Sequence, residues 1–325
     1  FKKKKKKKKN GKFNLHQQRE ITMRIACLFI GLFLSISSFA QDSATLFKSA
    51  ITKAQAGDMP GAIADFDKCI GLSPDYTDAY YWRGVAKAAI GEANGALTDF
   101  EKTTSLDPGH AQAYLTAGNL YNQQGNPKAA EANLTPAVKL LPDNMEARLN
   151  RGKAYTNLGK HDLAIKDYTT VLAVDRNNYE CFINRGISHR QMQSFDQAAD
   201  DFSSAIRVNK MNPDGYINRG IVYRMKEEFE NAIADYTQAI VVDPNNSDAF
   251  YNRGIAYSKR DQHQDAIRDF SKAISIDPND ADSYMNRGIE KVIIGKKDDG
   301  CSDIVKASNL GLDKAIEQRN KFCKN

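Results

Sequence analysis

The chain has 325 residues, of which 41% are hydrophobic and 26% are charged, and its formal net charge is +6. The excess positive charge lies in residues 1–40, which hold eleven lysines and arginines and one acid, whereas residues 41–325 hold 35 basic and 39 acidic side chains. A surface that binds nucleic acid needs clustered basic side chains. The charge balance after residue 40 therefore argues against nucleic acid as a partner.

The first forty residues have the composition of a leader rather than of a folded domain. The chain begins with Phe1 and eight lysines and reaches its first methionine at Met23. We interpret residues 1–22 as a non-native or mis-started leader, with a lysine-rich interaction tail as the alternative. A basic residue, an apolar stretch and small residues ending at Ala40 then predict a signal peptide over residues 23–40, and hence export to the periplasm or out of the cell. The apolar stretch is shorter than the roughly 20 residues of a spanning helix, so no stable membrane span is expected.

A period of 34 residues runs through the rest of the chain. Arginine followed by glycine recurs at multiples of this spacing, at Arg83, Arg151, Arg185, Arg219, Arg253 and Arg287. The repeats start at Ser43, Thr77, Ala111, Met145, Tyr179, Pro213, Ser247 and Ala281. Counted from these starts, glycine or alanine occupies positions 8 and 20, an aromatic residue usually occupies position 24, and proline often occupies position 32. Small residues allow two antiparallel helices to approach closely, and the proline ends the second helix.

This pattern resembles the tetratricopeptide repeat family, whose 34-residue unit is a helix-turn-helix with small, aromatic and proline residues at fixed positions. The resemblance covers residues 43–314. It implies an all-α fold, a right-handed α-α superhelix (solenoid) of about eight units, with a capping helix over residues 313–325. It also implies that the first helices line a concave groove, that the partners are proteins or peptides, and that the chain is not an enzyme. Leu134, Arg176 and Lys210 depart from the pattern, so we expect repeats three to five to be slightly looser.

Asparagine occupies position 6 of five consecutive repeats, at Asn150, Asn184, Asn218, Asn252 and Asn286. A carboxamide both donates and accepts hydrogen bonds, so this asparagine ladder is suited to hold the main chain of an extended peptide whatever its sequence. The alternative is that these asparagines cap or bridge neighbouring helices. Isoleucine flanks the ladder at position 9, as Ile187, Ile221 and Ile255. These side chains are candidates for contact with apolar partners, or they pack between repeats.

Arginine at position 7 and aspartate at position 23 form a second pair of columns. Repeat three lacks both members, having Ala117 and Asn133, and this joint loss favours pairing within a repeat. Repeat one is the exception, with Ser49 opposite Asp65. We interpret these columns as structural.

Two cysteines near the end of the chain are suited to form a disulfide. Cys301 lies about eight residues before the turn at residues 309–312 and Cys323 about ten residues after it, so at 1.5 Å per residue their heights along two antiparallel helices differ by only about 3 Å. We expect a bond between them, since an oxidising compartment would favour it. Cys69 is expected to be a buried thiol.

The sequence lacks the motifs of common catalytic, nucleotide and metal sites. The four histidines after residue 40 fall in different repeats without a shared register, so neither a metal, a cofactor nor a catalytic residue is expected. Two functional hypotheses remain: a module that binds extended peptides in the groove, and a structural scaffold of a cell-envelope assembly that uses its outer surface or its ends. A third hypothesis, an intracellular co-chaperone, requires the leader to be artefactual. Such modules hold a carboxylate with lysine and arginine side chains, whereas position 5 of these repeats is mostly apolar.

Overall fold

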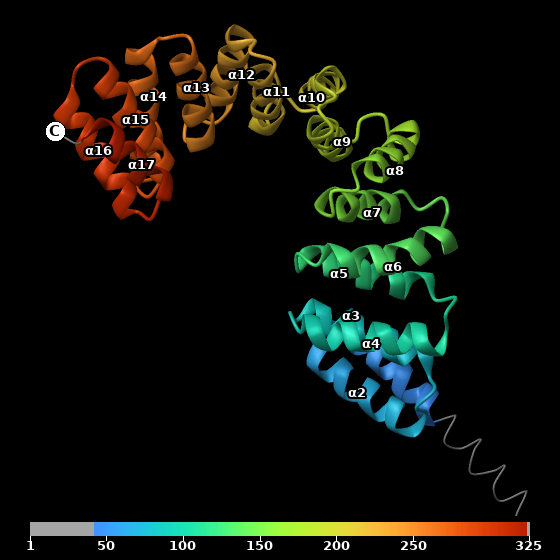
Figure 1. Cartoon of the computed structure of the whole chain (residues 1–325). Helices are drawn as coiled ribbons and strands as arrows, with labels where there is room; N and C mark the ends of the chain where they lie inside the picture. Colours follow the sequence, from blue (N-terminus) through green and yellow to red (C-terminus); the bar gives the residue numbers. More distant parts are fainter. Residues whose placement is uncertain (1–41, 324–325) are drawn as a thin grey trace, which may run out of the picture. The chain divides into compact units, whose positions relative to one another are not determined.

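The computed structural model describes residues 42–323, and every regular element in this range is an α-helix (Figure 1). The all-α fold of helix-turn-helix repeats is therefore confirmed. The predicted leader and signal peptide lie outside the described residues. None of the helices between residues 42 and 323 combines the length and the apolar character needed to cross a bilayer.

First and second helices alternate along the chain. The first helix of repeat one lies within residues 42–55, and the later first helices are α3 (Thr77–Ala89), α5 (Ala111–Gln123), α7 (Met145–Asn157), α9 (Tyr179–Gln191), α11 (Pro213–Met225), α13 (Ser247–Lys259) and α15 (Ala281–Ile293). The second helices are α2 (Met59–Leu72), α4 (Ala93–Leu106), α6 (Pro127–Leu140), α8 (His161–Val174), α10 (Phe195–Val208), α12 (Phe229–Val242), α14 (His263–Ile276) and α16 (Lys297–Asn309). The last helix is α17 (Asp313–Phe322). From α3 onward, the first helices begin at the residues where the sequence repeats start.

The chain divides into two compact units, and the boundary in the sequence falls within the third repeat: one unit ends at Leu120 and the other begins at Tyr121. In the second unit, each first helix packs against the second helix of its own repeat and against the second helix of the repeat before it. Successive first helices also touch one another, whereas second helices described in this unit make no comparable contact with the next second helix. The first helices are therefore the inner side of this unit's curvature.

The helix starts are fixed by side chains that cap them. Asn144, Asn178 and Asn246 accept hydrogen bonds from the backbone N–H three residues ahead, and Asp280 does the same before α15. Such a cap satisfies an N–H that has no partner inside the helix. Because these residues share position 34, the period of the sequence also sets where each helix begins.

A left-handed residue at position 15 makes the turn between the two helices of each repeat. Glycine fills this position in some repeats, such as Gly159 with φ of 71°. Repeats five to seven instead have Gln193, Glu227 and Asp261, with φ between 57° and 61°. A side chain in this conformation costs roughly 1 kcal/mol relative to glycine.

Close packing within five of the repeats brings the glycine at position 8 against the aromatic ring at position 24. A Cβ atom added to Gly220 would lie 2.7 Å from Cε1 of Tyr236, which is closer than van der Waals contact allows. The ring of Tyr236 and the methyl group of Ala232 are fully buried. The same contact recurs in the pairs Gly84 with Phe100, Gly152 with Tyr168, Gly186 with Phe202 and Gly254 with Phe270. The aromatic ring therefore lies directly between the two helices where they cross, in contact with the glycine.

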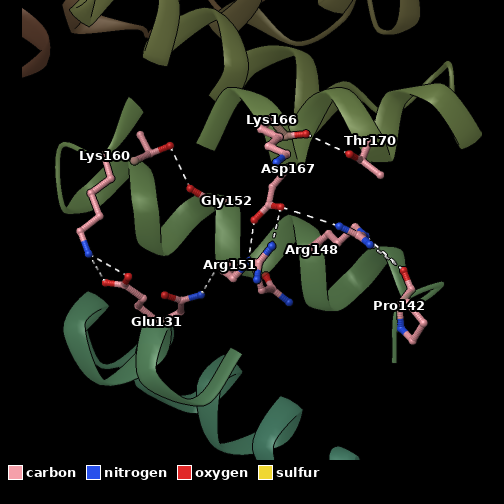
Figure 2. A network of polar contacts seen from close by, with 12 residues as sticks. Glu131, Pro142, Arg148, Arg151, Gly152, Lys160, Lys166, Asp167 and Thr170 are labelled. Carbon is pink, nitrogen blue, oxygen red and sulfur yellow. Dashed lines mark hydrogen bonds and ion pairs between the residues drawn. The ribbon is translucent and has the colours of Figure 1, made fainter. Parts of the chain in front are cut away.

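Paired arginine and aspartate side chains link the helices of a repeat. Arg219 donates from Nε and Nη2 to the two carboxylate oxygens of Asp235, at 2.8 and 2.7 Å, and from Nη1 to Ser203 of the preceding repeat at 2.9 Å. Figure 2 shows the equivalent pair of Arg151 and Asp167, with both bonds at 2.8 Å. The expected pairing within a repeat is confirmed in the six repeats that have both residues.

The aspartates of these pairs are buried and the arginines are mostly covered, with 7% and 22% of the side chain exposed at Asp235 and Arg219. Bonding to Asp235 raises the pKa of Arg219 against the opposite effect of its burial. Loss of one partner would leave a buried charge without compensation.

The last helix, α17, packs on α16 and α15. Its Ala315 is fully buried against a cluster that contains Met285, Ile304 and Ala307. The structure joins Cys301 of α16 to Cys323 by a disulfide across a Cα–Cα distance of 5.6 Å. Cys69 and Cys181 are buried thiols.

We predict that Arg219→Ala lowers the free energy of unfolding by about 3 kcal/mol, because Asp235 is left buried and unpaired. Arg268→Ala is the matched control, since Arg268 is 75% exposed and pairs with Asp265 on its own helix, where such pairs are worth under about 1 kcal/mol. Urea unfolding of both variants measures the difference. Equal loss of stability in the two variants would contradict a structural role for the pair.

We also predict that Gln193→Gly raises the free energy of unfolding by roughly 0.5–1 kcal/mol, because glycine adopts the left-handed conformation without strain. Gly159→Gln, the reverse change at the same position of the preceding repeat, should lower it by a similar amount. Thermal unfolding followed by circular dichroism tests both. A Gly159→Gln variant as stable as the parent would show that the turn is not strained.

Candidate functional site

The asparagine ladder lies on the inner side of the second unit, on α7, α9, α11, α13 and α15. All five side chains are half-buried, so each keeps part of its surface open. In three of them Nδ2 donates to the backbone carbonyl four residues earlier: Asn184 to Glu180 at 2.9 Å, Asn218 to Asp214 at 2.9 Å and Asn252 to Asp248 at 2.8 Å. These bonds hold the three carboxamides in one repeated orientation.

The remaining hydrogen-bonding capacity differs along the ladder. No donor among the described residues reaches the carboxamide oxygen of Asn184 or Asn252, whereas that of Asn218 accepts from Nη1 of Arg190 at 3.1 Å. Asn286 donates to Tyr251 Oη at 3.3 Å, and the backbone carbonyl of Asn150 accepts from Asn122. The bonds of Nδ2 are therefore uniform over the three middle members of the ladder, whereas the carboxamide oxygens differ among them, and the two end members make other bonds.

The isoleucines beside the ladder are half-buried. Ile187 packs against the core cluster of Ala198, Phe202 and Val222. Ile221 packs against a cluster around Tyr236. Their contacts agree with packing between repeats, and their exposed parts border the ladder.

An apolar pocket lies in the first unit, where tryptophan takes the ladder position. Trp82 is 41% exposed and borders a pocket of about 330 Å³. The pocket is lined by Ile51, Ala54, Gln55, Met59, Trp82, Val85 and Ala86. These residues come from the first helices of repeats one and two and from the start of α2. The sequence pattern did not predict this pocket, although the only tryptophan of the chain occupies a ladder position and was a usable signal.

The charged groups of the inner side are separated along the helices. Acidic residues at position 2 are exposed at the helix starts, where Glu180 pairs with Lys153 at 2.5 Å. Arg190 and Arg224 lie in the last turns of α9 and α11. Neither arginine was predicted as a site residue from the sequence, although their spacing of 34 residues was an available signal. No group of three potential metal ligands occurs among residues 42–323. The inner side therefore offers charged and hydrogen-bonding side chains to a partner.

Comparison with known families agrees with the repeat pattern. The family described as "Tetratricopeptide repeat" matches residues 247–280 and, in a second form, residues 115–178 and 183–240, and the family described as "TPR repeat" matches residues 222–261. These repeats form a scaffold family that is typically non-enzymatic, in agreement with the expectation that the chain is not an enzyme. No curated protein matches the chain.

Several solved structures are similar. A tetratricopeptide repeat protein from Parabacteroides merdae ATCC 43184 is 20% identical, with 86% of this chain and 97% of that chain covered and a TM-score of 0.53. The APC/C hetero-tetramer Cut9-Hcn1 is 18% identical, with coverages of 89% and 57% and a TM-score of 0.57. YrrB, described as a TPR protein with an unusual peptide-binding site, is 23% identical, with coverages of 57% and 95% and a TM-score of 0.52. At these identities the likeness concerns the fold. From its period, its helix pairs and these matches, the chain is a tetratricopeptide repeat protein.

Proposed function

We propose that this protein–protein interaction module binds extended polypeptide segments along the inner side of its second unit, through the asparagine ladder. The observation that carries the proposal is the repeated orientation of Asn184, Asn218 and Asn252, each held by a bond to its own helix. A side chain that is already fixed loses little conformational freedom when it binds. YrrB, which has a similar fold, is described as having a peptide-binding site.

The spacing of the ladder suits an extended main chain. Neighbouring first helices are in contact, so their axes lie about 10 Å apart. An extended peptide advances about 3.3 Å per residue. Each carboxamide would therefore meet roughly every third peptide residue, and main-chain bonds at that interval are independent of the peptide's sequence. Ile187, Ile221 and Ile255 would flank the peptide with apolar surface.

A structural scaffold of a cell-envelope assembly is the second candidate. It is favoured by the same bonds, because an asparagine that donates to its own helix and an isoleucine packed between repeats already have structural partners. Under this proposal the outer surface or the ends of the repeats would carry the partners.

We further propose that the protein is exported to the periplasm or out of the cell. The support is the disulfide between Cys301 and Cys323, since such bonds persist in oxidising compartments and are rare where thiols are kept reduced.

The asparagine triple variant Asn184→Ala, Asn218→Ala and Asn252→Ala tests peptide binding. We expect it to weaken binding of random dodecapeptide mixtures by about 100-fold, since each lost hydrogen bond is worth about 1 kcal/mol. Fluorescence anisotropy measures the affinity.

The control for this test removes three exposed asparagines that lie outside the ladder, by Asn177→Ala, Asn245→Ala and Asn279→Ala. It should bind as the parent does. Equal binding by both triple variants would sink the peptide proposal and favour the scaffold.

Export predicts the redox state of the cysteines. Protein recovered from the cell envelope or the medium should show Cys301 linked to Cys323 and free thiols at Cys69 and Cys181 in non-reducing peptide mass spectrometry. Recovery of the chain only from the cytosol, with thiols at all four positions, would contradict the proposal.

A further inference from the structure

Two arginines on the inner side of the second unit are without an acidic partner. Arg190 of α9 and Arg224 of α11 occupy position 12 of consecutive repeats, on first helices that touch each other. Both side chains are half-buried. Among the described residues, no carboxylate lies within 4 Å of either guanidinium, whereas the arginines at position 7 of the same repeats, Arg185 and Arg219, each hold an aspartate with two hydrogen bonds.

The guanidinium groups are also short of hydrogen-bond acceptors. Nε of Arg224 is buried and makes no hydrogen bond within the described part of the chain. The hydroxyl of Tyr236 is also buried without a partner among residues 42–323, and it lies near Arg224: burial raises the pKa of Tyr236, and the charge of Arg224 lowers it. Nη1 of Arg190 donates to the carboxamide oxygen of Asn218, a ladder residue. Arginine has five N–H donors in a planar fork, so each group still has donors to offer.

The repeat register explains why the protein itself supplies no acid. Position 12 of one repeat contacts position 10 of the next: Thr156 lies 3.1 Å from Ser188, and Ser258 donates to Glu290 at 2.6 Å. Position 10 in the repeat after Arg190 is Val222, and position 10 in the repeat after Arg224 is Ala256. Neither residue has the polar side chain that Ser188 and Glu290 provide at this position.

Val222 and Ala256 are both fully buried and apolar. Glu290 shows that an acid can occupy position 10 in this chain. Neither arginine therefore has an acidic partner at this contact between repeats.

The position of both arginines near the C-terminal ends of their helices stabilises their positive charge but does not supply hydrogen-bond acceptors. A basic residue in the last turn of a helix is favoured by about 0.3–1 kcal/mol by the helix dipole. This effect gives Nε of Arg224 no acceptor. Burial lowers the pKa of Arg190, Tyr236 raises it by a smaller amount and the charge of Arg224 lowers it further, so its positive form is less favoured here than in water. The acidic residues at position 2 lie ten residues away on each helix, which is about 15 Å along its axis.

We propose that Arg190 and Arg224 form a carboxylate-binding subsite of the peptide groove, so that the groove prefers acidic segments. The inference rests on the proposed peptide function and adds a preference that the ladder alone does not give. A carboxylate between the two guanidinium groups would receive charge-assisted hydrogen bonds, which are about twice as strong as neutral ones. The carboxylate is either that of an aspartate or glutamate side chain or that of the peptide's C-terminus.

The test uses random dodecapeptide mixtures with one central position fixed as aspartate, glutamate, asparagine or glutamine, each with an amidated C-terminus. We expect the parent protein to bind the acidic mixtures about tenfold more tightly than the amide mixtures at low salt, and the difference to shrink as salt is added. A fifth mixture, with central asparagine and a free C-terminus, distinguishes a terminal carboxylate from a side-chain carboxylate.

The variant Arg190→Gln with Arg224→Gln keeps side-chain length and some hydrogen bonding and removes the charge. It should bind acidic and amide mixtures equally. The matched control is Arg207→Gln with Arg268→Gln, which removes the same charge from exposed arginines on the second helices α10 and α14, and it should keep the preference.

The outcomes separate the two proposals. A parent protein without acidic preference, or a preference that survives the loss of Arg190 and Arg224, overturns the subsite, while the asparagine triple variant still decides on the ladder. A parent protein that binds no mixture overturns the proposed function, and the subsite with it.

Thermal unfolding distinguishes a binding role of the two arginines from a structural one. Because their charges are uncompensated, the double variant should melt at or above the temperature of its control. Loss of the preference together with a melting temperature well below the control would assign the arginines to packing and overturn the inference.

Discussion

Contact between a glycine and an aromatic ring sets the distance between the two helices of a repeat, and the other features of the fold depend on it. With Gly220 against Tyr236 at a separation that leaves no room for a Cβ atom, Arg219, next to Gly220 in the chain, is brought to Asp235. The same arginine reaches Ser203 in the preceding repeat. The close contact between Gly220 and Tyr236 inside one repeat thereby positions Arg219 to bond with the preceding repeat.

This alignment gives the second unit its functional character. Since every first helix has the same relation to its second helix, equivalent residues of successive first helices form columns on the inner side. A column can be uniform, as at Asn184, Asn218 and Asn252, or it can change along the chain, as where Trp82 takes the ladder position in the first unit. A change in a column marks a repeat whose inner surface differs from that of its neighbours.

The sequence was sufficient for the features that repeat. A strict period with small residues and prolines predicted where the helices begin, and the joint change to Ala117 and Asn133 in repeat three predicted that arginine and aspartate pair within a repeat. It was not sufficient for contacts between repeats. The repeat period does not specify which positions of neighbouring helices are in contact. Such contacts determine the bond of Asn218 to Arg190, the pocket beside Trp82 and the unpaired Nε of Arg224.

The disulfide at the end of the second unit has a consequence for assembly. A stack of like units can grow wherever its last face accepts another copy, and Ile304 and Ala307 would provide such a face on α16. Because α17 covers that cluster and is tethered through Cys301 and Cys323, this face of α16 is closed to another copy. Reduction of the disulfide would remove the tether, and the cover would then depend on the packing of Ala315 and its neighbours.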